Sequence, residues 1–206
     1  MCFINKITEM QLDVLKEMGN IGAGHAATSL STILNKKIDM KVPNARVLSF
    51  DDMLEMAGGS DQIVASVFLR ISGDVSGSMF FILPHKQADV FIKQMMIGSS
   101  IDSVDIGNKE IAFSALQELG NILTGSYLSS LADFTNLSLV PSVPEISIDL
   151  FGAIISYGFI ELSQVSDFGI VIDTMLMEDA GTNIESLNGF LFLDPDSNYR
   201  NCIRHH

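Results

Sequence analysis

The sequence predicts an α+β fold built from two similar halves. One polar pattern occurs twice, at the constant offset that separates Glu17 from Glu118. Its members are Asp13, Glu17, Asn20 and Pro43 in the first half and Ser114, Glu118, Asn121 and Pro144 in the second. In each half, a long segment with helical periodicity precedes short extended runs. Hairpin-like connections favour antiparallel pairing, so we expect pseudo-twofold duplicated α-βββ units that form one continuous, largely antiparallel six-stranded sheet, with the long helices packed on it.

Each element is predicted from its local pattern. Residues 7–34 carry apolar side chains at the 3.6-residue period of an amphipathic helix, with Thr8 as its N-cap. Residues 72–76 are typical of a hairpin turn. The expected helices are 7–34, 86–97 and 109–134. The six expected strands are 38–42 with 45–50 on either side of Pro43, then 63–71, 77–83, 147–160, 170–177 and 187–193. A polar connector is expected at 98–107 and a short stub at 196–206.

Length and composition predict one sizeable folded unit. The 206 residues are 47% hydrophobic and 18% charged, which is enough apolar material for a substantial core. A repeat of about a hundred residues is too long for a solenoid unit. We therefore expect a single domain over residues 1–206, made of two repeats at about 8–98 and 109–195.

The charge excludes some partner classes and favours others. A formal net charge of −13, with 12 basic residues and no basic run, argues against nucleic acid and against an anionic membrane surface. A protein partner with an exposed Lys or Arg is the natural complement. Cys2 and Cys202 have no metal-like spacing, and no apolar stretch is long enough to span a bilayer. We expect a cytoplasmic protein with no metal site of its own.

The repeated polar residues are expected to share one helix face. Residues four apart on a helix differ by about 40° and residues three apart by about 60°, so Asp13, Glu17 and Asn20 form one stripe. A single such stripe is usually an ordinary solvated face, but two copies at fixed spacing indicate function. Gly19 and Gly120 adjoin the two Asn residues. Because glycine has no side chain, we expect both to leave space on the surface, so that a partner can reach the Glu carboxylate and the Asn amide.

A Glu and an Asn without a nucleophile suit one kind of chemistry. A carboxamide has both donors and an acceptor and can orient a water molecule. Phosphoryl transfer passes through a loose transition state, in which positioning of the attacking water matters most. The Glu, one turn earlier, could pair with a Lys on the partner. Such a site would be incomplete alone, because the partner would supply the phosphate and its metal.

The full spacing makes a family resemblance specific. The pattern Asp/Ser-x3-Glu-x2-Asn-x22-Pro is similar to the signature of the CheC/CheX/FliY family, phosphatases that act on the phosphorylated chemotaxis regulator CheY. Both copies in this chain fit the pattern, and the resemblance covers nearly the whole chain. Two motif copies on about two hundred residues resemble the two-site members of the family.

The resemblance implies roles for the repeated residues. Glu17 and Glu118 would contact a regulator lysine, and Asn20 and Asn121 would hold the hydrolytic water. Asp13 and Ser114 would support the Glu residues, and Pro43 and Pro144 would fix the start of a strand. No cofactor is implied for this chain, because Mg²⁺ would be carried by the phosphorylated regulator.

Family members also typically bind CheD, a receptor glutamine deamidase. Residues 146–155, with Asp149 exposed among apolar neighbours, are similar to the CheD-contact region. An ordinary strand with one outward Asp explains that segment equally well.

Three functions remain open at this point. The leading hypothesis is hydrolysis of an aspartyl phosphate on CheY by a monomeric protein that also binds and modulates CheD. The main alternative is a non-catalytic adaptor that docks or sequesters CheY or CheD. A flagellar-switch scaffold is the third.

Overall fold

The computed structural model describes residues 7–97, 109–162, 168–178 and 184–193. The predicted connector 98–107, the stub 196–206, Cys2 and Cys202 lie outside these residues. The helices are α1 (Glu9–Leu34), α2 (Phe50–Met56), α3 (His85–Ile97), α4 (Lys109–Thr135) and α5 (Phe151–Leu162). The strands are β1 (Ile38–Ser49), β2 (Ile63–Gly73), β3 (Gly77–Pro84), β4 (Leu139–Pro141), β5 (Glu145–Leu150), β6 (Phe168–Glu178) and β7 (Ile184–Leu193).

The strands form one antiparallel sheet, which confirms the predicted α+β class. Its order is β1-β6-β7-β3-β2-β4, and β5 also pairs with β2. The predicted number of six strands was wrong, because the described residues form a sheet of seven strands. The extra strand arises where β4 and β5 pair with different parts of β2, whereas β1 runs unbroken along β6.

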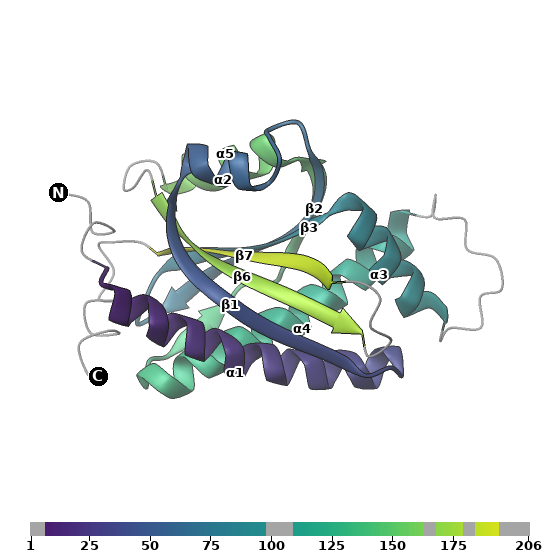
Figure 1. Ribbon diagram of the computed structural model, residues 1–206, viewed down its shortest axis with the longest axis horizontal. Helices are drawn as coiled ribbons and strands as arrows, with labels where there is room; N and C mark the ends of the chain where they lie inside the picture. Colours follow the sequence, from purple (N-terminus) through teal and green to yellow (C-terminus); the bar gives the residue numbers. More distant parts are fainter. Residues whose placement is uncertain (1–6, 98–108, 163–167, 179–183, 194–206) are drawn as a thin grey trace.

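Each face of the sheet buries its own hydrophobic core. The larger core lies between the sheet and the helices α1, α3 and α4, and Leu30, Leu116 and Leu123 are fully buried in it. The smaller core lies on the other face, where Met53 of α2 and Phe151 of α5 pack over β2, β3 and β6. Figure 1 shows this layering, with α1 and α4 below the sheet and α2 and α5 above it. Alternate side chains of β2 enter the two cores, because successive strand residues face opposite sides of a sheet.

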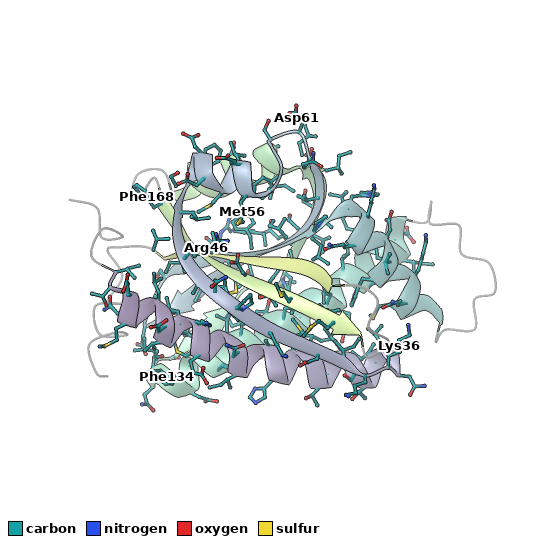
Figure 2. All side chains as sticks on the ribbon, in the orientation of Figure 1. Lys36, Arg46, Met56, Asp61, Phe134 and Phe168 are labelled. Carbon is teal, nitrogen blue, oxygen red and sulfur yellow. The ribbon has the colours of Figure 1, made fainter. Side chains whose placement is uncertain are left out.

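The two long helices contact each other and run in opposite directions. Lys36, which follows α1, and Phe134, near the C-terminal end of α4, are labelled at opposite ends of the helix pair (Figure 2). The predicted N-cap Thr8 is confirmed, since its side chain accepts a hydrogen bond from the backbone N–H of Gln11 in a capping box. The Asn residues that follow α1 and α4 both adopt the left-handed conformation, Asn35 with φ 49° and Asn136 with φ 54°.

Two helices occur where the sequence predicted extended structure or none. The expected strand 147–160 is wrong beyond Leu150, because α5 begins at Phe151. A short apolar run without clear periodicity fits a buried strand and a buried helix equally well. Helix α2 was not predicted; it begins after Ser49, whose side chain caps it by accepting from the backbone N–H of Asp52. Within the described ranges, no helix is long and apolar enough to cross a membrane.

Candidate functional site

The first polar stripe lies on α1. Asp13 and Glu17 are exposed, as expected from their position on a solvated helix face. In the part of the chain that the structure describes, the Glu17 carboxylate has no hydrogen bond or ion pair with another side chain. Asn20, one turn further, is only half exposed. The stripe therefore presents two carboxylates to solvent and an amide that is turned toward the protein.

The Asn20 amide binds the backbone of β1. Its Nδ2 donates to the carbonyl oxygens of Lys16 (3.1 Å) and Val42 (3.2 Å), and its Oδ1 accepts from the Val42 N–H (2.8 Å). Val42 needs these partners, because β1 has a bulge there. Lys41 pairs with Met175 and Asn44 pairs with Asp173, so residues 42 and 43 together oppose a single residue of β6.

The second polar stripe lies on α4 and differs from the first. Ser114, Glu118 and Asn121 are all exposed. The Ser114 hydroxyl donates to the carbonyl oxygen of Glu110 at 2.8 Å, within its own helix. Among the described residues, no hydrogen bond or ion pair involves the side chains of Glu118 and Asn121. This copy therefore offers a carboxylate and a carboxamide to an approaching molecule, one helical turn apart.

The expectation that Gly19 and Gly120 open the surface for a partner is wrong. Both glycines are buried and face the sheet. A Cβ on Gly19 would lie 3.3 Å from Val42 Cγ2, and a Cβ on Gly120 would lie 2.5 Å from Val67 Cγ1. These glycines therefore let the helices approach β1 and β2 closely.

Three further helical glycines have different surroundings. A Cβ on Gly22 would lie 3.0 Å from Tyr127 Cα, so Gly22 lets α1 and α4 cross at close range. Gly24 and Gly125 are exposed, and an added Cβ would meet nothing within 4 Å. Each follows an Asn of the pattern by four residues, so each extends its stripe by one turn.

The two prolines of the pattern occupy equivalent bulges. Pro43 lies inside β1, so it does not begin a strand as predicted, whereas Pro144 directly precedes β5. Pro141 pairs with Ile71 and Glu145 pairs with Phe68, so three residues of the second half face two of β2. Each bulge therefore contains one extra residue.

The residues before these prolines face opposite ways. Val42 is 1% exposed and lies in the main core, whereas Val143 is 73% exposed. The two dipeptides themselves do not reveal this difference, because both are Val-Pro. The one local signal is Pro141, where the first half has the buried Met40.

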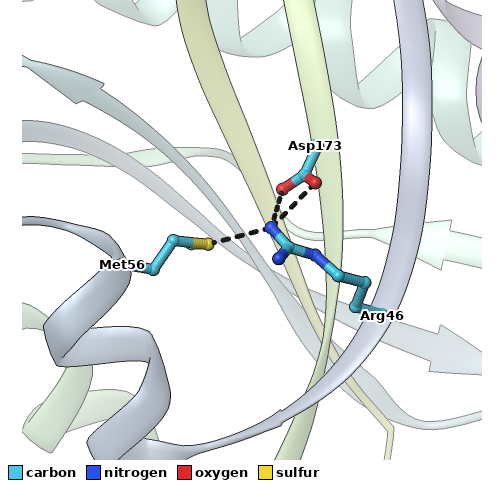
Figure 3. Close-up of polar contacts among 3 residues, drawn as sticks. All are labelled: Arg46, Met56 and Asp173. Carbon is cyan, nitrogen blue, oxygen red and sulfur yellow. Dashed lines mark hydrogen bonds and ion pairs between the residues drawn. The ribbon is translucent and has the colours of Figure 1, made fainter.

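The other side of the β1 bulge carries an ion pair. Arg46 Nη2 donates to both carboxylate oxygens of Asp173, at 2.9 and 2.8 Å, and lies 3.4 Å from Met56 Sδ (Figure 3). These residues line a cavity of about 480 Å³ between the sheet and α2. The pair joins β1 to β6 next to Pro43.

Asp149 lies on β5, where the sequence placed it. It is exposed, and its neighbours Ile148 and Leu150 are 37% and 42% exposed. Its Oδ1 accepts from the Leu150 N–H at 2.7 Å. Beside it is a cavity of about 320 Å³, lined in part by Phe68 and Tyr157. This edge of the sheet combines an acidic group with exposed apolar side chains.

Comparison with known proteins places the chain in a family. The CheC-like family profile matches residues 10–46 and 111–148, and each segment contains one copy of the polar pattern with its proline. The CheY-P phosphatase CheC of Bacillus subtilis (strain 168) is 50% identical over 196 residues, which is 95% of this chain and 93% of that protein. The chain belongs to the CheC-like family.

Solved structures with lower identity share the fold. Thermotoga maritima FliY has a TM-score of 0.71 and 23% identity, and the match covers 95% of this chain and 96% of that chain. A CheX–CheY–BeF3–Mg²⁺ complex from Borrelia burgdorferi has a TM-score of 0.50 and 16% identity, with 84% of this chain and 96% of that chain covered. At these identities the likeness concerns the fold, and the argument for activity depends on the site.

Proposed function

We propose that this protein is a cytoplasmic phosphatase that hydrolyses the aspartyl phosphate of the response regulator CheY. The proposal rests on one observation: Glu118 and Asn121 are exposed one turn apart on α4, without a side-chain hydrogen bond or ion pair among the described residues, and within a segment that matches the family. The name of the half-identical B. subtilis relative, a CheY-P phosphatase, supports the same activity.

The proposed chemistry depends on positioning. When α4 docks beside the phosphorylated aspartate, the Asn121 carboxamide holds a water molecule in line with the phosphorus atom. Water attacks phosphorus, the bond to the aspartate oxygen breaks, and inorganic phosphate and a free carboxylate result. Because the transition state is loose, orientation of the water contributes more than removal of its proton.

Glu118 fixes the orientation of the bound regulator. Its exposed carboxylate can pair with a lysine of the regulator, and the net charge of −13 complements a basic contact surface. Mg²⁺ enters the reaction with the phosphorylated regulator, so this chain needs no metal ligands of its own. We expect Glu118→Ala to weaken binding and raise KM more than it lowers kcat.

The main alternative is a non-catalytic adaptor that sequesters CheY or CheD. The two functions differ in turnover, which can be measured as the loss of phosphoryl label from CheY with Mg²⁺ at substoichiometric protein. A phosphatase releases many phosphates per molecule, whereas an adaptor protects the label in proportion to its own concentration. The variant with both Asn20→Ala and Asn121→Ala should lose turnover while it still binds CheY. Full turnover in that double variant would refute the proposed chemistry.

We further infer one domain over residues 1–206, made by duplication of repeats at about 8–98 and 109–195. The sheet order supports it: outward from the centre, the first half contributes β3 and β2 and the second contributes β7 and β6. The antiparallel helix pair and the two left-handed Asn residues agree with a pseudo-twofold relation. Such a domain already contains two copies of the site, so we propose a monomer.

CheD binding is the second partner that we propose. The exposed Asp149 lies at a sheet edge among apolar side chains, a combination that suits a protein interface. Asp149→Lys should weaken CheD binding strongly without changing turnover of phosphorylated CheY. Unchanged affinity in a titration with CheD would remove Asp149 from the interface.

A further inference from the structure

We infer that the two sites are unequal. Asn20 is a structural clamp, a residue whose amide holds the backbone of β1 at Val42, whereas Asn121 positions the water for turnover. This inference rests on the proposed function and assigns the reaction to one of its two copies. It differs from the sequence prediction, which gave both Asn residues the same role.

The hydrogen bonds of Asn20 leave no side-chain N–H that could donate to a water molecule. A carboxamide has two N–H donors, and those of Asn20 go to Lys16 and Val42. Its oxygen accepts from the Val42 N–H at 2.8 Å. Asn121 is exposed and makes no such bonds within the described residues. The group that would hold the water is engaged in one copy and free in the other.

The bulge next to each Asn explains the difference. In the first half, the Val42 side chain enters the core at 1% exposure, so its peptide groups are turned toward Asn20. In the second half, Val143 is 73% exposed. The segment is tied to β2 instead, since the Ser142 N–H donates to the Arg70 carbonyl oxygen at 2.8 Å and the Ser142 hydroxyl accepts from the Arg70 N–H at 3.0 Å.

Local sequence favours these two conformations. Pro141 lacks an N–H and ends β4, whereas the equivalent residue, Met40, is buried inside a continuous strand. The Arg46–Asp173 pair holds β1 against β6 beside the bulge. In the second half, Ser147 corresponds to Arg46. Phe68 corresponds to Asp173, because Phe68 pairs with Glu145 as Asp173 pairs with Asn44, so no ion pair can form there. The first bulge is therefore held by contacts on both faces of the sheet: Asn20 binds it on one face and the Arg46–Asp173 ion pair lies beside it on the other.

The open bulge also adds a contact beside the second site. Pro144 follows Val143, and its Cβ lies 3.4 Å from the Cβ position of Gly120, the neighbour of Asn121. Val143 is the residue before Pro144 and is 73% exposed, so we expect its side chain to give the docked regulator an apolar contact. The buried Val42 can make no such contact.

Single variants test the inference. Asn121→Ala should lower turnover of phosphorylated CheY by more than about tenfold, because the attacking water loses its alignment. Asn20→Ala should keep turnover within about twofold of the parent but lower the unfolding midpoint, because the N–H and the carbonyl oxygen of Val42 both lose the Asn20 side chain as their hydrogen-bond partner. Val143→Ser should raise KM by several-fold with kcat retained and with no loss of stability.

Hydrogen exchange gives a readout independent of activity. The Val42 amide should exchange slowly in the parent protein and much faster in Asn20→Ala, whereas the Val143 amide should be unaffected by Asn121→Ala. If Asn20→Ala does not fold, slow exchange of the Val42 amide and of the Asn20 side-chain amide in the parent protein would still show that Asn20 is bonded to β1. Fast exchange of both groups would overturn the clamp.

The two proposals fail in different ways. Equal, roughly half losses of turnover in the two single variants would overturn the inference but leave the phosphatase function intact. Retained turnover in the double Asn variant would refute the site itself.

Discussion

Gly125 provides the sharpest test of where the regulator docks, which we propose is the exposed face of α4 that carries Glu118 and Asn121. It lies one turn beyond Asn121 on the exposed face of α4, and an added Cβ would meet nothing within 4 Å. A glycine inside a helix is unfavourable by about 1 kcal/mol relative to alanine. The space beside it is open among the described residues, and it lies one turn beyond Asn121, so we expect a regulator docked at Asn121 to pass close to it. The test is Gly125→Ala, and Gly24→Ala is its matched control on α1.

Both substitutions should stabilise the free protein by similar amounts. The methyl group enters open space in each case, so the helix-propensity gain of about 1 kcal/mol is not offset by a clash. For a chain of this size, that gain corresponds to an increase of about 2–4 °C in Tm. Thermal unfolding, followed by circular dichroism, measures the gain directly. A lower Tm in either variant would contradict the description of these positions as sterically open.

Activity should separate the two variants. A methyl group on Gly125 would displace the docked regulator and misalign the water held by Asn121, and a displacement of about 1 Å can cost about 100-fold in rate. We expect kcat/KM for phosphorylated CheY to fall by about tenfold or more in Gly125→Ala and to stay unchanged in Gly24→Ala. Full activity in Gly125→Ala would place the partner elsewhere on the helix.

The remaining predictions concern stability. Burial raises the pKa of Tyr127 to about 12, although its hydrogen bond with Thr174 acts in the opposite direction. In the unfolded chain the pKa of tyrosine is near 10. The preference of the folded state for the neutral Tyr127 side chain therefore adds its full contribution to stability below pH 10, and this contribution is lost as the pH rises toward 12. The loss is up to about 3 kcal/mol, and urea titrations of Tyr127→Phe should not show it. Thr124 is buried, and its hydroxyl has no partner among the described residues, so Thr124→Val should stabilise by about 1 kcal/mol, whereas Thr124→Ser should not. Gly120→Ala should destabilise by about 1–3 kcal/mol, because its Cβ would lie 2.5 Å from Val67 Cγ1; an unchanged urea midpoint would mean that β2 can move away.

Local patterns in the sequence were sufficient for much of the fold. The helical period and Thr8 defined α1 to within two residues, and the turn at residues 72–76 located the β2–β3 hairpin. These features depend on neighbours in the chain, which a single sequence contains. Helix α5 was missed because its identity depends on tertiary packing: Phe151, Ile154 and Ile155 all contact the second core.

The repeated pattern located the candidate site but not its geometry. Glu17 and Glu118 are exposed in both copies, as a polar stripe on a surface helix predicts. The role of Gly19 and Gly120 was misjudged, because the sequence does not give the rotation of a helix relative to the sheet beneath it. The structure gives that rotation, and both glycines face valine side chains of the sheet.

The difference between the two Asn residues arises across three segments, and Pro141 is its one local signal in the sequence. Asn20 is clamped because the bulge of β1 turns Val42 inward, and that bulge is held in turn by the pairing with β6. The second copy has the same Val-Pro dipeptide, yet Pro141 ends β4, and Asn121 makes no side-chain hydrogen bond within the described ranges. An Asn within reach of a strand bulge can either satisfy the backbone of that bulge or face a partner, because its donors cannot do both. A duplicated chain can divide these roles between its halves, so that one copy stabilises the sheet while the other acts on the regulator.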